Sequence, residues 1–229
     1  MVKIAILKFP GTNCDEDVRH VLKNVMGLDS EIVWYREYVE GSYDAIIIPG
    51  GFSYGDWLRA GAIAARSGVM EEIGNDVSRG VPVLGICNGF QILVEAGLLP
   101  GALLPNDSGR FECRWIKVVV ENPKGPWLSL AEDGQVIDMP IAHAEGRYYL
   151  DDETYTRLLG GVSILRYAKG WNPNGSIYDI AGIGSENGLV LGLMPHPERA
   201  SEPDLVPRGF TMGGRVIFES LAHSLKKGW

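Results

Sequence analysis

Short apolar runs alternate with amphipathic stretches through the first hundred residues, and this alternation constrains the fold more than any other feature of the chain. The stretches at 15–26 and 58–80 carry apolar residues three and four positions apart, a spacing typical of helices packed on a core. Strands rich in Val, Ile and Leu that alternate with helices indicate a parallel sheet covered on both faces. The apolar runs occupy residues 2–9, 31–36, 43–51 and 81–87.

The pattern changes from about residue 111, where further strand-like runs follow one another with Gly, Asn, Pro and Asp between them. These runs predict an antiparallel excursion inserted into the parallel sheet or laid against it. A closing helix is expected at 215–227, and the chain contains no repeat, low-complexity tract or linker. We therefore expect one α/β domain over residues 1–229, with a doubly wound, mostly parallel sheet, flanking helices and an antiparallel insertion. The later strand-like runs are 111–121, 135–144, 147–150, 162–168, 177–185 and 189–195.

Charge and cysteine content exclude several classes of function. The formal net charge is −8 at pH 7, which argues against a surface for nucleic acid or an anionic membrane. No apolar run approaches the roughly 18 residues of a membrane helix. Three widely spaced cysteines, without a CxxC pair, form neither a disulfide framework nor a zinc motif. This usage fits a reducing compartment, and we expect a cytoplasmic protein.

The apolar run at 81–87 ends in a sharp corner that carries a thiol. Gly85, Cys87 and Gly89 form a G-x-C-x-G turn, and a helical pattern follows at once. This is the arrangement of a nucleophile elbow, in which glycines allow a strand and a helix to approach closely. The helix N-terminus beside Cys87 favours the thiolate. The alternative is that Cys87 is simply a small core residue.

A thiolate nucleophile needs a base and an acid that orients it, and the best pair follows the strand-like run at 189–195. His196 stands at the strand tip, and Glu198 follows two residues later. If both strands point their carboxyl ends to the same edge, His196 faces Cys87. A solvated surface turn is the competing interpretation. His143, followed by Glu145, is a rival base and a candidate lining residue.

The third requirement is a set of hydrogen-bond donors that stabilise the negative charge developing on the substrate oxygen in the transition state. Pro49, Gly50 and Gly51 follow the buried run at 43–48, and glycines there free backbone N–H groups. The Gly51 and Asn88 amides are the predicted oxyanion hole. A simple turn is the alternative interpretation of this segment.

The cysteine elbow, the His–Glu pair and the Pro-Gly-Gly segment together resemble the class I (triad) glutamine amidotransferases, which have a flavodoxin-like fold. Further stretches resemble the separate small glutaminase subunits of phosphoribosylformylglycinamidine synthase, an enzyme of de novo purine biosynthesis. Two departures are Thr12, where serine is common, and Trp57, where tyrosine is common. The matching segments are 49–51, 85–91 and 196–198 for the class, and 9–15, 50–62, 106–115, 142–149, 172–176 and 194–200 for the subunit family.

The resemblance implies that a Cys87–His196–Glu198 triad hydrolyses L-glutamine to glutamate through a thioester. The ammonia would pass to a larger ATP-dependent synthetase subunit that converts formylglycinamide ribonucleotide to formylglycinamidine ribonucleotide, in a complex with a small accessory subunit. The chain has no P-loop motif, so we expect no cofactor or metal in it and place ATP and Mg²⁺ on the partner. The resemblance also implies a glutamine-binding set of Gly50, Phe52, Gln91, Asn106, Ser108, Phe111 and His143.

Three other functions remain open at this stage. A cysteine hydrolase of the dienelactone type also uses a cysteine elbow, but its acid precedes its histidine. The DJ-1-like thiol proteins share the sheet and the elbow cysteine, and several place His directly after it, where this chain has Asn88. A catalytically silent scaffold that binds a synthetase is the third possibility.

Overall fold

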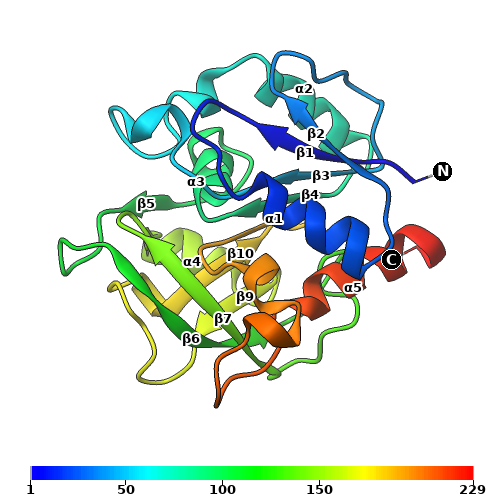
Figure 1. Cartoon of the computed structure of the whole chain (residues 1–229). Coiled ribbons are helices and arrows are strands. Elements are labelled where there is room, and N and C mark those ends of the chain that lie inside the picture. The colour runs from blue at the N-terminus through cyan, green and yellow to red at the C-terminus, as the bar shows by residue number, and fades with distance from the viewer. Residues whose placement is uncertain (1, 229) are drawn as a thin grey trace.

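A single nine-stranded sheet forms the centre of the computed structural model, which describes residues 2–228 (Figure 1). The strand order is β2-β1-β3-β4-β11-β10-β9-β6-β7. Its first five strands are parallel, and the remaining four extend the same sheet with antiparallel pairing. The predicted antiparallel insertion is therefore continuous with the parallel sheet and is not laid against it.

The parallel half is built from the apolar runs that the sequence pattern identified. Its strands are nearly continuous in Val, Ile, Leu and Ala because helices cover both faces. In β3, β4 and β11 every residue is buried. The strands are β1 (Ile4–Lys8), β2 (Ser30–Trp34), β3 (Ala45–Ile48), β4 (Val83–Ile86) and β11 (Val190–Leu193).

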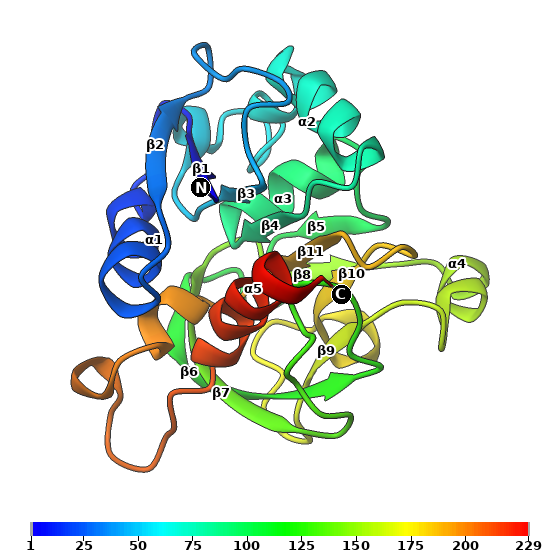
Figure 2. The ribbon, with the colours of Figure 1, turned by 90° about the vertical axis from the view of Figure 1, so that its right-hand side faces the viewer.

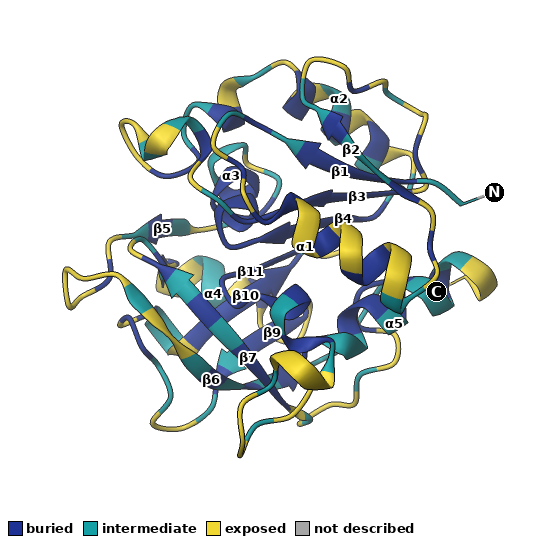
Figure 3. Cartoon of the chain, in the orientation of Figure 1, coloured by how far each residue is buried: buried dark blue, intermediate teal, exposed yellow. Residues whose placement is uncertain are grey.

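The antiparallel half contains the longest strands. β6 and β7 pair over eight positions, from Glu112 opposite His143 to Val119 opposite Val136. Their burial alternates over much of their length, as expected where one face meets the core and the other meets solvent (Figure 3). The strands are β6 (Glu112–Glu121), β7 (Val136–His143), β9 (Ile164–Tyr167) and β10 (Ile180–Gly184); β5 (Ala102–Leu104) and β8 (Arg147–Tyr149) form a separate two-stranded sheet.

Helices cover the two faces of the parallel half. Helices α1 and α5 lie on one side, and α2 and α3 lie on the other (Figure 2). α1 continues directly into a π-helical turn, Val21–Val25. A fifth, short helix, α4, stands apart from these layers. The bounds are α1 (Asp15–His20), α2 (Val69–Ser78), α3 (Asn88–Glu95), α4 (Asp152–Leu158) and α5 (Arg215–Lys227).

Two helical segments differ from the sequence-based expectation. The helix expected over 58–80 is reduced to a short 3₁₀ turn, Ala64–Arg66, and α2. Leu58 and Gly61 have φ of 68° and 80°, which a right-handed helix cannot contain. Helix α4 was not expected. Its N-cap is Asp151, whose carboxylate accepts a hydrogen bond from the Thr154 backbone N–H at 2.8 Å.

The carboxyl ends of β1, β3, β4 and β11 meet at one edge of the sheet. β4 pairs with β11 so that Ile86 lies beside Leu193, and it pairs with β3 so that Gly85 lies beside Ile48. The loops that follow these strands therefore converge. In an open α/β sheet, this edge is where ligands bind.

Candidate active site

Cys87 stands in a strained turn between β4 and α3. Its φ is 52° and its ψ is −104°, an unusual conformation for a residue with a side chain. The flanking glycines permit the turn: a Cβ on Gly89 would lie 1.8 Å from the Ile48 carbonyl oxygen, and one on Gly85 would lie 2.7 Å from the Gly89 oxygen. The elbow predicted from sequence is present.

The Cys87 thiol is buried, and its surroundings favour a reactive sulfur. Its Sγ lies 3.6 Å from the Ala142 carbonyl oxygen at the end of β7. Helix α3 begins at the next residue, so partial positive charge from the helix N-terminus stabilises a thiolate at this position.

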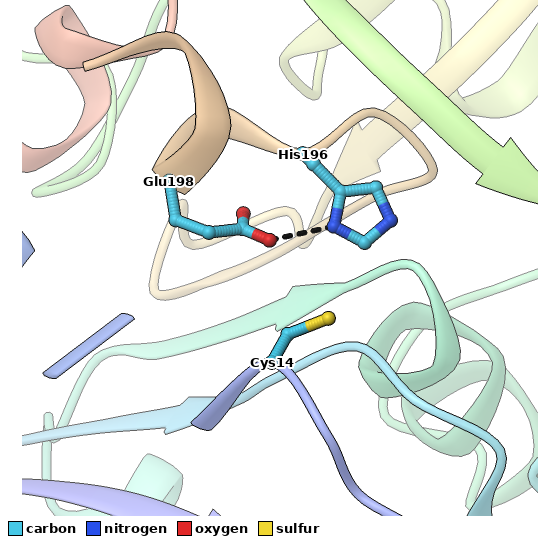
Figure 4. Close-up of side chains that lie close together, drawn as sticks. All are labelled: Cys14, His196 and Glu198. Carbon is cyan, nitrogen blue, oxygen red and sulfur yellow. Dashed lines mark hydrogen bonds and ion pairs between the residues drawn. The ribbon is translucent and has the colours of Figure 1, made fainter. Parts of the chain in front are cut away.

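His196 and Glu198 come from the segment after β11 and form a buried pair. The His196 amide donates to the Pro140 carbonyl at 2.8 Å, which ties this segment to β7. Glu198 lies in a 3₁₀ turn, Pro197–Ala200, and its Oε1 is 2.6 Å from His196 Nδ1 (Figure 4). Only 2% of His196 and 1% of Glu198 are exposed, so water does not screen the pair.

The environment of His196 favours its charged form. Burial alone would lower the pKa of His196, but the negative charges of Glu198 and Cys87, together with the neighbouring Cys14 sulfur, raise it well above 6.5. Within residues 2–228, His196 Nε2 has no hydrogen-bond partner of standard geometry. An imidazolium oriented through Nδ1, with Nε2 free, can deliver a proton to a leaving group.

Two backbone N–H groups near Cys87 are available as donors. Gly51 has φ of 153°, and a Cβ there would lie 2.7 Å from the Gly11 carbonyl oxygen, so only glycine fits. Among the described residues, neither the Gly51 nor the Asn88 amide donates a hydrogen bond to the protein. Free donors at these two positions are what an oxyanion hole requires.

A cavity of about 210 Å³ opens onto these groups. Phe52 and Phe111, each about half exposed, have ring centroids 6.4 Å apart. Gly50 adjoins the cavity, because a Cβ at this position would lie 2.8 Å from His196 Cε1. The lining residues are Asn13, Cys14, Gly51, Phe52, Cys87, Phe111, Ala142, His196 and Arg199.

Four residues of the expected glutamine-binding set, Gln91, Asn106, Ser108 and His143, hydrogen-bond to the protein and do not line this cavity. The Gln91 amide donates to the Glu145 carbonyl at 2.7 Å and accepts from Asn88. Asn106 is buried and bonds to the His143 carbonyl, the Arg110 carbonyl and the Gly146 amide. Ser108 is exposed and donates to Glu112.

His143, the rival base, lies in a different environment from His196. Its Nδ1 is 3.1 Å from the Asn106 side-chain oxygen, and no carboxylate of residues 2–228 pairs with it. Burial, together with the neighbouring charge of His196, lowers the pKa of His143 to about 4. His143 is therefore neutral at physiological pH, whereas His196 is charged.

Sequence reasoning missed Cys14 and Arg199 as cavity residues. Cys14 Sγ is buried and accepts a hydrogen bond from Arg199 Nη2 at 3.1 Å. The Asn13 and Cys14 amides both donate to the Gly50 carbonyl, which ties the loop after β1 to the cavity wall. The available signals were the unexplained cysteine in FPGTNCD and the arginine directly after His-Pro-Glu.

A cysteine elbow, a buried His–Glu pair and free N–H donors on a doubly wound sheet are the features of a triad glutamine amidotransferase. The chain belongs to this family: residues 1–208 match the CobB/CobQ-like glutamine amidotransferase domain. This match confirms the resemblance drawn from the sequence motifs.

Individual relatives show which members of the family this chain is similar to. The chain is 52% identical to phosphoribosylformylglycinamidine synthase subunit PurQ of Methanosarcina mazei, over 96% of this chain and 97% of that one. It is 49% identical to the PurQ subunit of Pyrococcus horikoshii, over 99% and 100% of the two chains. In the solved structure of PurLQS from Thermotoga maritima, a 44% identical chain superimposes with a TM-score of 0.85, over 98% of this chain and 99% of that one.

A more distant structure shares the fold alone. A glutamine amidotransferase from Thermotoga maritima is 14% identical and has a TM-score of 0.57, over 98% of this chain and 92% of that one. Together, these comparisons confirm the predicted mostly parallel α/β fold with flanking helices.

Proposed function

We propose that this chain is the glutaminase subunit of phosphoribosylformylglycinamidine synthase, with Cys87, His196 and Glu198 as its catalytic triad. The observation that carries the assignment is the buried His196–Glu198 pair, 2.6 Å apart, at the same sheet edge as the strained Cys87 elbow. The continuous sheet supports treating the whole chain as one glutaminase domain. Phe52 and Phe111 enclose the glutamine side chain at the cavity mouth, and Gly50 supports the cavity wall.

In the first half-reaction, the Cys87 thiolate attacks the side-chain amide carbon of glutamine. A carbon–sulfur bond forms, and the negative charge that develops on the amide oxygen is held by the Gly51 and Asn88 N–H groups. The carbon–nitrogen bond then breaks, and His196 Nε2 gives its proton to the leaving nitrogen. Ammonia departs and leaves a glutamyl thioester on Cys87.

In the second half-reaction, neutral His196 accepts a proton from water, and the resulting hydroxide attacks the thioester carbon. The carbon–sulfur bond breaks, which restores the thiolate–imidazolium pair, and the new side-chain carboxyl group loses its proton to solvent as glutamate leaves. Glu198 holds the imidazole by Nδ1 and stabilises its positive charge in both steps.

The chain has no P-loop motif, so we place the acceptor of the ammonia on a partner. The relatives are subunits of a synthase, and the Thermotoga maritima assembly is PurLQS. We place the ATP- and Mg²⁺-dependent step, the conversion of formylglycinamide ribonucleotide to formylglycinamidine ribonucleotide, on a larger PurL-type partner. A PurS-type accessory subunit completes the complex.

A cytoplasmic location is part of the proposal. Cys14, Cys87 and Cys113 are all unpaired, which fits a reducing compartment. No helix within the described part of the chain is both long and apolar enough to cross a membrane.

The membership of the amidotransferase family argues against the DJ-1-like and dienelactone-type interpretations. A glutamine-analogue electrophile such as diazo-oxonorleucine is expected to label Cys87 in the amidotransferase. A catalytically silent scaffold is the remaining alternative, and reconstitution separates it from an active subunit.

The test is Cys87→Ala in a complex reconstituted with its native partner subunits. We expect glutamine-dependent synthesis to disappear, whereas synthesis from added ammonium salt continues. Cys113→Ala is the matched control, because Cys113 is exposed on β6 and its loss leaves both activities unchanged. Retention of glutamine-dependent synthesis in Cys87→Ala, or loss of both activities, would overturn the proposal.

A second measurement concerns regulation of the same site. Hydrolysis without an acceptor wastes glutamine, so we expect the isolated chain to be a poor glutaminase that becomes competent on docking. Equal turnover of the isolated chain and the assembled complex would contradict this expectation.

A further inference from the structure

We propose that Cys14, Cys87 and His196 form a binding site for a soft divalent cation, with Zn²⁺ as the natural candidate. The site overlaps the catalytic cavity, so an occupied site blocks the glutaminase. The inhibitory consequence rests on the proposed function, whereas metal binding itself does not.

The side chains converge on one point of the cavity wall. The ligand atoms of Cys14, His196 and Glu198 all lie within 4.8 Å of one another (Figure 4). A Cβ on Gly50 would lie 3.2 Å from Cys14 Sγ, 2.8 Å from His196 Cε1 and 3.5 Å from Cys87 Cβ. The Cys14 sulfur, the His196 ring and the Cys87 Cβ thus lie around the same glycine, and all three residues line the cavity.

An unpartnered nitrogen supplies the second, independent observation. His196 is 98% buried, as 2% of it is exposed, yet its Nε2 has no hydrogen-bond partner of standard geometry within the described residues. Nδ1 is already committed to Glu198. A metal-bound histidine typically uses one ring nitrogen for the metal and donates the other to a carboxylate. Glu198 therefore orients His196 as it would in a metal site.

The charges also suit a divalent cation. Metal binding displaces the Nε2 proton of His196 and deprotonates the thiols, so Cys14 and Cys87 would each contribute one negative charge beside that of Glu198. Arg199 contributes one positive charge, which leaves a net charge of −2 around the metal. Arg199 Nη2 donates a hydrogen bond to Cys14 Sγ at 3.1 Å, so the sulfur is already an acceptor in this structure.

Coordination requires the three ligand atoms to approach one another. Zn–S bonds of about 2.3 Å and Zn–N bonds of about 2.0–2.1 Å place tetrahedral neighbours roughly 3.6 Å apart. The cavity of about 210 Å³ leaves room for a water molecule in the fourth position. Thiolate and imidazole ligands select Zn²⁺ or Cd²⁺ over Mg²⁺, which prefers oxygen.

An occupied site removes both reactive groups. The Cys87 sulfur and His196 Nε2 would be bonded to the metal and could neither attack glutamine nor transfer a proton. Inhibition should therefore be relieved by chelators and should compete with glutamine.

The first experiment measures binding without turnover. Cd²⁺ is titrated into the full chain, and the thiolate-to-metal charge-transfer band is followed in the ultraviolet. We expect one equivalent to bind wild-type protein and Cys113→Ser equally, and Cys14→Ser to bind at least tenfold more weakly. Mg²⁺ should produce no band. Equal Cd²⁺ affinity for Cys14→Ser and Cys113→Ser, or no saturable binding to wild type, would refute the site.

A second measurement uses wild-type protein alone, so it does not depend on how a variant folds. Alkylation by iodoacetamide is mapped by mass spectrometry with and without Zn²⁺. The metal should protect Cys14 and Cys87 but not the exposed Cys113. Unchanged alkylation of Cys14 would refute the proposal. Both measurements are made without glutamine. A negative result would therefore refute the metal site and would leave the proposed glutaminase activity untouched.

Discussion

Glu198 Oε1 lies 2.6 Å from His196 Nδ1, and this carboxylate–imidazole pair is almost fully buried. Replacement of Glu198 with Gln keeps the shape of the side chain but removes its charge. Glu198 counters the burial that would otherwise lower the pKa of His196. In Glu198→Gln the imidazole therefore loses its proton at a lower pH. We expect the turnover number to fall roughly 10²- to 10⁴-fold.

The pH profile distinguishes this effect from simple misfolding. The leaving ammonia needs protonated His196, so activity falls as pH rises through the pKa of that residue. In Glu198→Gln this alkaline limb should move to lower pH. Glu202→Gln is the matched control, because Glu202 pairs with the exposed His20 and its loss should leave the profile unchanged. An unchanged profile in Glu198→Gln would show that Glu198 does not set the charge of His196.

Those parts of the fold and site that depend on local pattern could be predicted from sequence. The elbow follows from glycine spacing, since Gly85 and Gly89 are required wherever a strand and helix approach this closely. His196 and Glu198 could be placed opposite Cys87 because parallel strands end at the same edge. Helix α4 was missed because seven residues are too short for a clear helical period.

The position of Cys14 could not be predicted, because it depends on contacts between loops distant in sequence. β1 and β11 are separated by β3 and β4 in the sheet. The loop after β1 is held at the cavity by contacts that include the Thr12–Gly51 bridge and the backbone N–H bonds to the Gly50 carbonyl. Cysteine spacing alone therefore gave no sign of a metal site, although the fold brings Cys14 beside His196.

Gly50 is a position where one methyl group should damage catalysis more than stability. Its backbone conformation is open to alanine, but the new Cβ would lie 2.8 Å from His196 Cε1 and 3.2 Å from Cys14 Sγ. The imidazole must shift, and a displacement of about 1 Å is expected to lower turnover roughly 10²-fold. Overpacking should lower the free energy of unfolding by about 1–3 kcal/mol.

Steady-state kinetics and urea unfolding together test the Gly50→Ala prediction. Gly68→Ala serves as the control, because a Cβ at Gly68, just before α2, meets nothing within 4 Å. Gly68→Ala should retain wild-type turnover. If Gly50→Ala turned over glutamine at the wild-type rate, the His196 position would not be critical for the reaction.

His143 should make the fold sensitive to mild acid. Burial, together with the charge of His196, lowers the pKa of His143 to about 4, whereas an unfolded histidine titrates near 6.5. The folded state thus binds fewer protons between these values. The stability contributed by neutral His143 is present above pH 6.5 and is lost as pH falls towards 4. Between pH 7 and pH 5, this loss amounts to about 2 kcal/mol.

His143→Gln removes this titration, because glutamine stays neutral throughout the range. The free energy of unfolding, measured in urea at pH 7 and pH 5, should fall by about 2 kcal/mol less in His143→Gln than in wild type. The comparison uses the pH-dependent difference, so any constant cost of disturbing the contact with Asn106 cancels. His223→Gln, on the partly exposed face of α5, should keep the wild-type pH dependence. The same loss of stability in His143→Gln as in wild type would mean that another group accounts for the acid sensitivity.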